Sequence, residues 1–382
     1  MARKLRIGII THNYPVDLFD RKDAGMFIHD FAYELSAYAK VFILCPKVHG
    51  KSGNFERVSV TWFDWGGGGA KFGNWLFFNP LSVMNFFKLL FFGRKAAIEF
   101  AKDNNLDFIL GAWLMPSGVF AWAAGAATGV PFATWALGSD INKYAKFPIL
   151  RQLIIYSLRR SRVNFANSYK LCNIVEVLSD RECKFLPAIT EFGEGKVYKR
   201  RKSNKVFRFL FVGRLERVKG VDVLIDAASR LEKKGIAFKL DLVGDGTLRG
   251  VLEKKMDGLG LSGRVEFVGF RDKAEVISHM KESDCLVLAS RSESLPLVIL
   301  EAARVGLPVV ATDVGDCKRI IEEYKMGYCV SKEDSQMLAL ALERMIKSRF
   351  EVIGKAEFSR VSRDFSQCGA VRKFLSSIDL SK

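Results

Sequence analysis

The sequence predicts an α/β protein of two domains, each built on a parallel sheet covered by helices. The chain has 382 residues, which is long enough for two separate hydrophobic cores. In both halves, short apolar runs alternate with amphipathic helical stretches, a pattern typical of parallel sheets with helices on both faces. A polar, strongly basic stretch at residues 192–205 separates the halves. We therefore expect domains at residues 1–195 and 196–365.

The bulk composition narrows the class of partner. The formal net charge is +17, which favours an acidic partner such as an anionic lipid, a phosphorylated substrate or a nucleic acid. No nucleic-acid-binding module accompanies the charge, so we expect no nucleic-acid partner. The seven cysteines form no Cys-x-x-Cys pair and the four histidines have no metal-ligand spacing. This pattern favours reduced thiols and a cytoplasmic protein without a zinc site, and the first apolar run is too short for a signal peptide.

The first half carries five expected strands and several polar loops at their ends. Gly25 precedes an amphipathic helix at Met26–Ala37, where it either makes a turn or lets the backbone approach a sugar or phosphate. His29 lies on that helix, and we expect it to be structural or at the surface rather than catalytic. Trp113 and Asp140 follow the third and fourth strands listed here, at the edge where parallel sheets bind ligands. The expected strands are Leu5–Ile10, Val41–Cys45, Asp107–Leu110, Pro131–Leu137 and Val163–Ala166.

Residues 62–92 are aromatic and nearly uncharged, but polar residues interrupt them before about 20 apolar positions accumulate, so the segment does not span a membrane. Two interpretations stay open. The first is a buried helix, which we favour for Val83–Phe92. The second is an apolar flap at Phe72–Phe78 that rests on lipid or on a lipid-linked acceptor.

A second segment also suggests a membrane surface. Residues 143–162 contain a basic amphipathic helix that begins at Pro148. Lysines and arginines lie at the ends and along the flank of this segment. Such a helix either packs on a core with a solvated charged face or contacts anionic lipid, where each basic residue contributes about 1 kcal/mol.

The second half has a regular alternation of strands and helices but no Gly-x-Gly-x-x-Gly after its first strand, which disfavours a nicotinamide dinucleotide site. A loop at Gly213–Gly220 follows that strand instead. Its Arg214 and Lys219 would suit a pyrophosphate, since a guanidinium and an ammonium neutralise it without a metal. The expected strands are Phe207–Val212, Phe238–Val243, Val265–Val268, Cys285–Ala289, Pro308–Ala311 and Tyr328–Val330.

The segment Asp284–Asp316 reads as strand, loop, helix and strand. Pro296 is expected in the first turn of the helix, which ends at Gly306. Free amides around Leu297 and Val298 would attract a phosphate. Two carboxylates accompany this helix start, Glu293 in the loop and Glu301 within the helix. Carboxylates accept hydrogen bonds from hydroxyls, so a ribose and a hexose are their natural partners.

These residues resemble a known family. Glu293-Ser294-Leu295-Pro296 with Glu301 resembles the Glu-x7-Glu motif of the retaining family-4 glycosyltransferases of GT-B fold, of the bacterial cell-surface polysaccharide type. Gly213-Arg214-Leu215 with Lys219-Gly220 is similar to the family's diphosphate signature, and Gly138–Asn142 also matches. Serine stands at 294 where the family usually has glycine, and Ala112 and Leu137 stand where relatives often carry histidines.

The resemblance implies two Rossmann-like domains whose parallel sheets face a central cleft, with a C-terminal helix at about 366–382 that packs back on the first domain. It implies that a sugar moves from a nucleotide diphosphate sugar with retention of configuration. In that scheme Glu293, Lys219 and Arg214 are catalytic, and no metal or other cofactor is needed, in keeping with the absence of an Asp-x-Asp triplet. The implied donor site also includes Ser294, Leu297, Val298, Glu301, Phe270, Arg271 and Gly25, and the implied acceptor side includes Asp140 and Trp113.

We therefore expect a glycosyltransferase that acts on a lipid-linked saccharide or a lipid, peripheral on the cytoplasmic face of the membrane. The alternative is a catalytically silent relative that binds nucleotide sugar as a sensor or scaffold. The donor nucleotide, the sugar, the acceptor and the linkage stay open.

Overall fold

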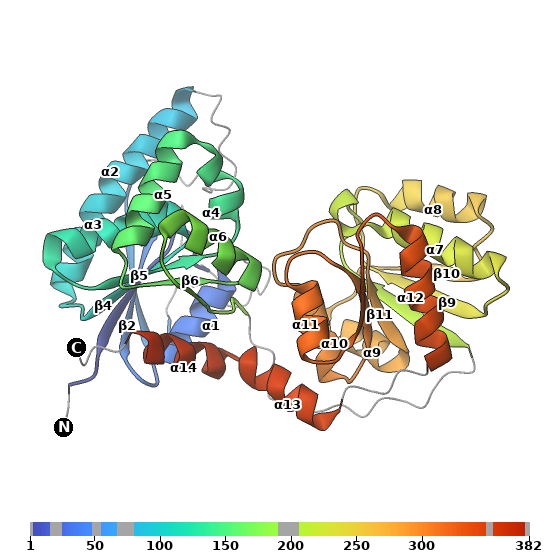
Figure 1. Cartoon of the computed structure of the whole chain (residues 1–382). Coiled ribbons are helices and arrows are strands. Elements are labelled where there is room, and N and C mark those ends of the chain that lie inside the picture. The colour runs from blue at the N-terminus through green and yellow to red at the C-terminus, as the bar shows by residue number, and fades with distance from the viewer. Residues whose placement is uncertain are drawn as a thin grey trace. The chain divides into compact units, whose positions relative to one another are not determined.

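The computed structural model describes residues 3–15, 25–47, 55–66, 80–189, 206–348 and 354–378. The chain divides into two compact units: Met1–Glu191 with Ser366–Lys382, and Phe192–Phe365. Each unit carries one sheet with helices packed on it (Figure 1). The predicted α/β class, with two Rossmann-like halves, is confirmed.

The N-terminal unit is built on a seven-stranded parallel sheet in the order β3-β2-β1-β4-β5-β6-β7. The strand order reverses beside β1, so the loops after β1 and β4 flank the switch point, where open α/β sheets bind ligands. The strands are β1 (Arg6–Ile10), β2 (Lys40–Pro46), β3 (Val58–Phe63), β4 (Phe108–Ala112), β5 (Phe132–Ala136), β6 (Val163–Ala166) and β7 (Cys183–Phe185).

Helices connect these strands, and the last helix of the chain returns to complete their core. Phe374 of this last helix, α14, is fully buried, with its ring 5.6 Å from Phe31, 6.0 Å from Phe108 and 5.7 Å from Phe165. The helices of this unit are α1 (Met26–Leu35), α2 (Pro80–Asp103), η2 (Leu114–Gly118), α3 (Val119–Thr128), α4 (Ser139–Asn142), η3 (Tyr144–Lys146), α5 (Pro148–Arg160), α6 (Tyr169–Ser179) and α14 (Gln367–Ser377).

The C-terminal unit has a six-stranded parallel sheet in the order β10-β9-β8-β11-β12-β13. Its switch point lies between β8 and β11, so the loops that carry Lys219 and Glu293 flank the same position. The strands are β8 (Phe207–Val212), β9 (Phe238–Val243), β10 (Val265–Gly269), β11 (Cys285–Leu288), β12 (Val309–Thr312) and β13 (Gly327–Val330). The helices are η4 (Arg217–Lys219), α7 (Val221–Lys233), α8 (Arg249–Gly258), α9 (Lys273–Glu282), α10 (Leu297–Arg304), α11 (Cys317–Glu323), α12 (Ser335–Ser348) and α13 (Lys355–Asp364).

The structure corrects the prediction that Val83–Phe92 is a buried helix. The stretch is helical within α2, but only one face is buried, through Phe86 and Leu89. Phe87 and Phe91 lie on the opposite face and are 63% and 66% exposed. The alternative flap at Phe72–Phe78 lies outside the described residues. Within the described ranges, no helix is both long enough and apolar enough to cross a bilayer.

Two other details differ from expectation. Pro296 is the N-cap of α10 rather than part of its first turn, and α10 ends at Arg304. Strands β3 and β7 were not predicted, because their runs are short or alternate with exposed positions.

Candidate functional site

The loop after β8 is shaped by Gly220. This residue has a φ of +62°, and a Cβ built on it would lie 2.0 Å from the carbonyl oxygen of Ala289. A side chain is excluded there, so the loop passes directly against the end of β11. The 3₁₀ turn η4 ends just before this glycine, which holds its last residue, Lys219, beside the loop that follows β11.

Lys219 and Glu293 meet at the switch point of the sheet. Lys219 Nζ lies 2.6 Å from Glu293 Oε1, and the hydroxyl of Ser290 donates to the same oxygen at 2.7 Å. The two charged side chains are 20% and 12% exposed, so their charge-assisted hydrogen bond is only weakly screened. Glu293 Oε2 receives no hydrogen bond from the described residues, which leaves an acceptor for a hydroxyl group.

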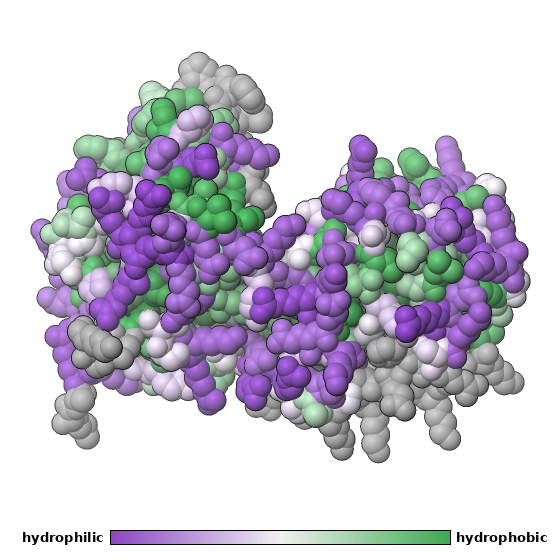
Figure 2. Space-filling model, in the orientation of Figure 1, coloured by the Kyte–Doolittle hydropathy of each residue, from purple (hydrophilic) through white to green (hydrophobic). Residues whose placement is uncertain are grey.

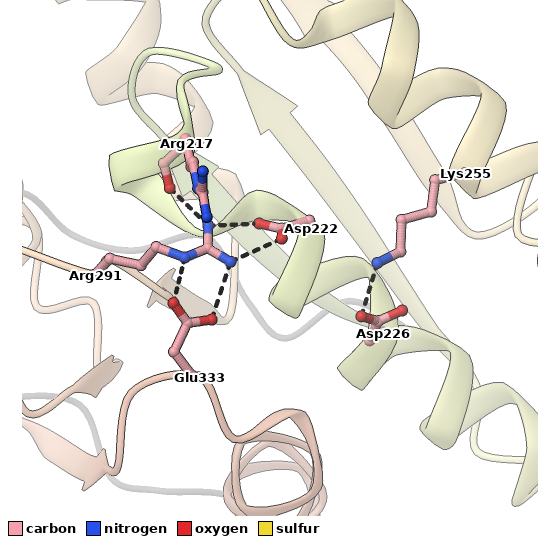
Figure 3. A network of polar contacts seen from close by, with 6 residues as sticks. All are labelled: Arg217, Asp222, Asp226, Lys255, Arg291 and Glu333. Atoms are coloured by element: carbon pink, nitrogen blue, oxygen red, sulfur yellow. Dashed lines mark hydrogen bonds and ion pairs between the residues drawn. The ribbon is translucent and has the colours of Figure 1, made fainter.

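Arg291 joins the same two loops through a bidentate ion pair. Its guanidinium donates to both carboxylate oxygens of Asp222 at 2.8 Å, to Glu333 through Nε and Nη2, and to the carbonyl oxygen of Arg217 at 2.6 Å. Figure 3 shows the guanidinium lying between the two carboxylates. The hydrogen bonds to Asp222 and Glu333 raise the pKa of Arg291, and Arg291 lowers the pKa of Asp222. This contact fixes the loop that carries Glu293 against the turn that carries Lys219.

The start of α10 adds backbone donors on the Glu293 side. Pro296 is the N-cap, and the amide of Ile299 already donates to its carbonyl oxygen at 3.0 Å. The amides of Leu297 and Val298 have no acceptor among the described residues. The carbonyl oxygen of Ser294, two residues before Pro296, accepts a hydrogen bond from the amide of Asp316 at 3.1 Å and so ties this turn to the loop after β12.

Glu301 lies further along the same helix and is largely enclosed. Burial raises the pKa of its carboxyl group, and the charges of Lys273 and Arg304 act in the opposite direction. Burial removes water from this carboxyl group, so a hydroxyl group that donates a hydrogen bond to it would stabilise it. That property fits the hydroxyl-binding role expected for it.

The remaining expected donor residues are more exposed. Arg214 is exposed, and its guanidinium has no hydrogen-bonding partner among the described residues. Phe270 is 64% exposed after the bulge that ends β10. Arg271 donates to the Phe270 carbonyl oxygen at 2.8 Å and lies 3.7 Å from Glu275. These side chains lie on loops that follow β8 and β10.

In the N-terminal unit, the loop after β1 is closely packed at Gly25. A Cβ there would lie 2.9 Å from both the Pro15 nitrogen and Tyr14 Cα. His29 is buried and shares a 2.9 Å hydrogen bond with the Tyr14 hydroxyl, a structural role. Trp113 follows β4 and is 8% exposed, with its ring 4.5 Å from that of His12. Burial lowers the pKa of His12 to about 3, so this imidazole is neutral at physiological pH.

Asp140 organises the neighbouring loop from within. Its side chain is fully buried, and its two oxygens accept hydrogen bonds from the amides of Leu114, Leu137, Gly138 and Ile141 at 2.8 to 3.2 Å. Burial raises the pKa of this carboxyl group, and the backbone hydrogen bonds oppose that shift. With no exposed surface, Asp140 shapes the loop after β5 and holds it against the turn that begins at Leu114, rather than offering its own oxygens to a ligand.

Sequence reasoning missed Arg291, Asp222 and Glu333. The partners of Arg291 lie 69 and 42 positions away, so no local spacing links them. The position of His12 in the sequence does not indicate its burial against Trp113 either. Across the described residues, no group of three or more His, Cys, Asp or Glu side chains could hold a metal ion.

The comparisons with known proteins bear on the same unit. Residues 196–359 match the family model of glycosyl transferases group 1. The match falls within the C-terminal unit and shows that this unit is similar to the glycosyl transferases of group 1. The matched range includes every residue of the Lys219–Glu293 and Arg291–Asp222 contacts.

Two curated relatives are similar to part of the chain. Alpha-D-kanosaminyltransferase of Streptomyces kanamyceticus is 31% identical over 216 residues, or 56% of this chain and 55% of the relative. Amylovoran biosynthesis glycosyltransferase AmsK of Erwinia amylovora is 30% identical over 174 residues, or 44% of this chain and 43% of the relative. The chain thus spans about half the length of these two relatives.

Solved structures match nearly the whole length of the chain. The lipopolysaccharide outer core galactosyltransferase WaaB superposes with a TM-score of 0.75 at 16% identity, over 99% of this chain and 100% of that one. Anabaena HepE in complex with UDP superposes with a TM-score of 0.70 at 19% identity, over 98% of this chain and 99% of that one. At these identities the likeness shows the fold, which is GT-B.

Proposed function

We propose that the protein is a retaining glycosyltransferase that moves a sugar from a nucleotide diphosphate sugar to an acceptor hydroxyl. The observation that carries this proposal is the contact between Lys219 and Glu293 at the switch point of the C-terminal sheet. In this proposal Lys219 is the cation for the diphosphate and Glu293 the carboxylate for the sugar, and the amides of Leu297 and Val298, which have no acceptor among the described residues, lie at the start of the helix that follows Glu293. The Anabaena structure in complex with UDP makes a uridine nucleotide the first donor to test.

In the proposed reaction the bond between the anomeric carbon and the diphosphate oxygen breaks while a bond to the acceptor oxygen forms on the same face. The proton of the acceptor hydroxyl passes to the departing phosphate oxygen. Lys219 and Arg214 stabilise the charge that develops on that diphosphate, so the reaction needs no metal. Glu293 orients the hydroxyls of the donor sugar, and Glu301 accepts from the ribose. Phe270 and Arg271 lie beside the base, whereas Trp113 belongs to the acceptor side.

We further propose that the acceptor is a lipid-linked saccharide or a lipid in cell-envelope polysaccharide synthesis. The name of the WaaB neighbour places that protein in lipopolysaccharide assembly, and the name of AmsK places it in amylovoran synthesis. The net charge of +17 favours a peripheral position on the anionic cytoplasmic face of the membrane.

Calorimetric titration of the full chain with UDP, GDP and ADP tests the donor site. Selective binding of one nucleotide, lost in the Arg214→Ala/Lys219→Ala variant, is the expected result. If the wild-type protein binds none of the three, the donor-site proposal is overturned.

A second measurement separates an enzyme from a silent nucleotide-sugar sensor. After the bound nucleotide is known, its sugar derivatives are incubated with the protein, and release of the nucleoside diphosphate is followed with water or added lipid-linked saccharide as acceptor. Turnover that the double variant lacks supports the transferase. Tight binding without any turnover across these donors and acceptors favours the sensor.

A further inference from the structure

Two helices of the N-terminal unit expose apolar side chains at one edge of its sheet. On α2, Met84, Phe87 and Phe91 recur at helical spacing on one face and are 45%, 63% and 66% exposed. Ile149 in the first turn of α5 is 78% exposed. Isolated exposed apolar residues are ordinary, but a helical stripe of this kind marks an interaction surface.

The opposite face of α2 is the one that packs on the core, which explains why the apolar stripe is exposed to solvent. Phe86, Leu89 and Phe100 are buried, and a Cβ on Gly93 would lie 2.2 Å from the ring of Phe120 on α3. The helix is therefore fixed closely on α3, and its second apolar stripe has no place in the core. In Figure 2, hydrophobic residues gather at the upper end of the N-terminal unit, where α2 begins.

Topology places this surface at the same edge as the acceptor-side loops. In a parallel sheet each connecting helix begins at the carboxyl ends of the strands. The helix α2 follows β3, and α5 follows β5. Trp113 and Asp140 follow β4 and β5, so they lie at that edge as well.

The charge around the stripe points to one kind of partner. Residues 80–98 hold three basic residues and no Asp or Glu, and residues 141–175 hold seven basic residues and no Asp or Glu. Lys146 and Arg151 flank Ile149 and are exposed. An apolar stripe whose neighbours in sequence carry only positive charges suits an interface of anionic headgroups above acyl chains.

We propose that Met84, Phe87, Phe91 and Ile149, with Lys88, Lys146 and Arg151, form a docking surface for an anionic lipid bilayer. We name it the α2–α5 surface. It deepens the proposed function by assigning the membrane partner to named side chains, and it turns the acceptor-side edge of the sheet toward the lipid. Vesicle binding does not require sugar transfer. The docking surface and the proposed glycosyltransferase activity can therefore be disproved independently.

Co-sedimentation with vesicles of phosphatidylcholine containing about one-third phosphatidylglycerol tests the proposal. We expect the full chain to bind at low salt and to lose binding at high salt. The Phe87→Ser/Phe91→Ser variant should partition at least about tenfold more weakly, and Lys146→Glu/Arg151→Glu should lose the dependence on phosphatidylglycerol.

Two matched controls keep the test specific. Val177→Ser removes an apolar side chain that is 86% exposed on α6, and Lys254→Glu/Lys332→Glu reverses two exposed charges of the C-terminal unit. Both should bind vesicles like the wild type, and unchanged thermal unfolding should show that all variants fold. The proposal is overturned if the wild type ignores anionic vesicles, if the α2–α5 variants bind as well as the controls, or if the stripe instead mediates a dimer that Phe87→Ser/Phe91→Ser dissociates.

Discussion

The ammonium of Lys219 and the carboxylate of Glu293, 74 positions apart in sequence, are joined by a hydrogen bond of 2.6 Å. The bond links the first loop of the C-terminal sheet to the loop after its fourth strand in the chain. A diphosphate that binds here has to share Lys219 with Glu293. The lysine is thus positioned in advance, and its interaction with the phosphate can strengthen as charge develops on the leaving group.

Replacement of Lys219 by alanine should reduce kcat by about 100-fold, with a smaller change in KM, because the lost contact is strongest in the transition state. Steady-state kinetics with the nucleotide sugar identified by calorimetry measures the two constants. Lys254→Ala, which removes an exposed lysine on α8 that belongs to none of the site's contacts, serves as the control. Normal turnover with only a raised KM would show that Lys219 contributes uniform binding.

The same pair should contribute to the stability of the C-terminal unit. Lys219→Met and Glu293→Gln should each lower the free energy of unfolding by about 1–2 kcal/mol, since each leaves a partly buried charged partner. The double variant should cost less than the sum, and urea unfolding of the four proteins gives the coupling energy. Strict additivity would mean that the two side chains do not interact in solution.

Arg291 should tolerate neither lysine nor alanine. An ammonium cannot donate to Asp222 and Glu333 in the planar geometry of the guanidinium, so both Arg291→Lys and Arg291→Ala should destabilise the unit by about 3 kcal/mol and weaken nucleotide binding. The control is Lys255→Ala, which breaks the single 2.7 Å ion pair with Asp226 and should cost about 1 kcal/mol or less. If urea unfolding gives equal losses of stability for Arg291→Lys and Lys255→Ala, the bidentate ion pair of Arg291 does not stabilise the unit in the proposed way.

Gly220 should be irreplaceable by alanine for a reason that Gly235 does not share. Both glycines have positive φ, +62° and +68°, but a Cβ at Gly235 meets nothing within 4 Å. Gly235→Ala should therefore cost about 1 kcal/mol of backbone strain, whereas Gly220→Ala adds a collision with the Ala289 carbonyl oxygen and should cost several times more. Thermal unfolding compares the pair directly, and similar costs would argue that the loop relaxes freely.

The N-terminal unit should lose stability in mild acid through His12. The pKa of its imidazole falls from 6.5 to about 3 on folding. Between these two values the imidazole is protonated in the unfolded chain and neutral in the folded chain. Unfolding is then favoured as pH falls from 6.5 toward 3, by about 3 kcal/mol at pH 4.5. His12→Gln should flatten the pH dependence of the unfolding free energy in this window. If His12→Gln leaves the pH dependence of the unfolding free energy unchanged, a group other than His12 causes the loss of stability in acid.

The sequence predicts most of the C-terminal fold because the information is local. Short apolar runs such as Cys285–Leu288 are buried on both faces, and amphipathic helices separate them. Strand β3 was missed because its residues alternate between buried and exposed positions at the sheet edge. The face of α2 could not be assigned, since its aromatic residues surround the helix and only the position of α3 decides which of them are buried.

The candidate site could be proposed from the sequence where the family motifs are contiguous, as at Arg214 and Lys219, and the roles of these two residues stay predictions. It was not predictable where it depends on contacts between distant residues. Nothing adjacent to Arg291 in the sequence indicates a bidentate partner at Asp222, and nothing near Asp140 indicates that four amides enclose it. These contacts exist only after the sheet has assembled.

The return of α14 to the first sheet makes the N-terminal unit discontinuous in the chain. Its core is completed by Phe374, a residue translated after the whole C-terminal unit. During synthesis Phe31, Phe108 and Phe165 therefore lack the ring of Phe374 that packs against them until the second unit has left the ribosome. A single cut between the units therefore yields no intact pair of domains, and this late step is where the nascent chain has most need of a chaperone.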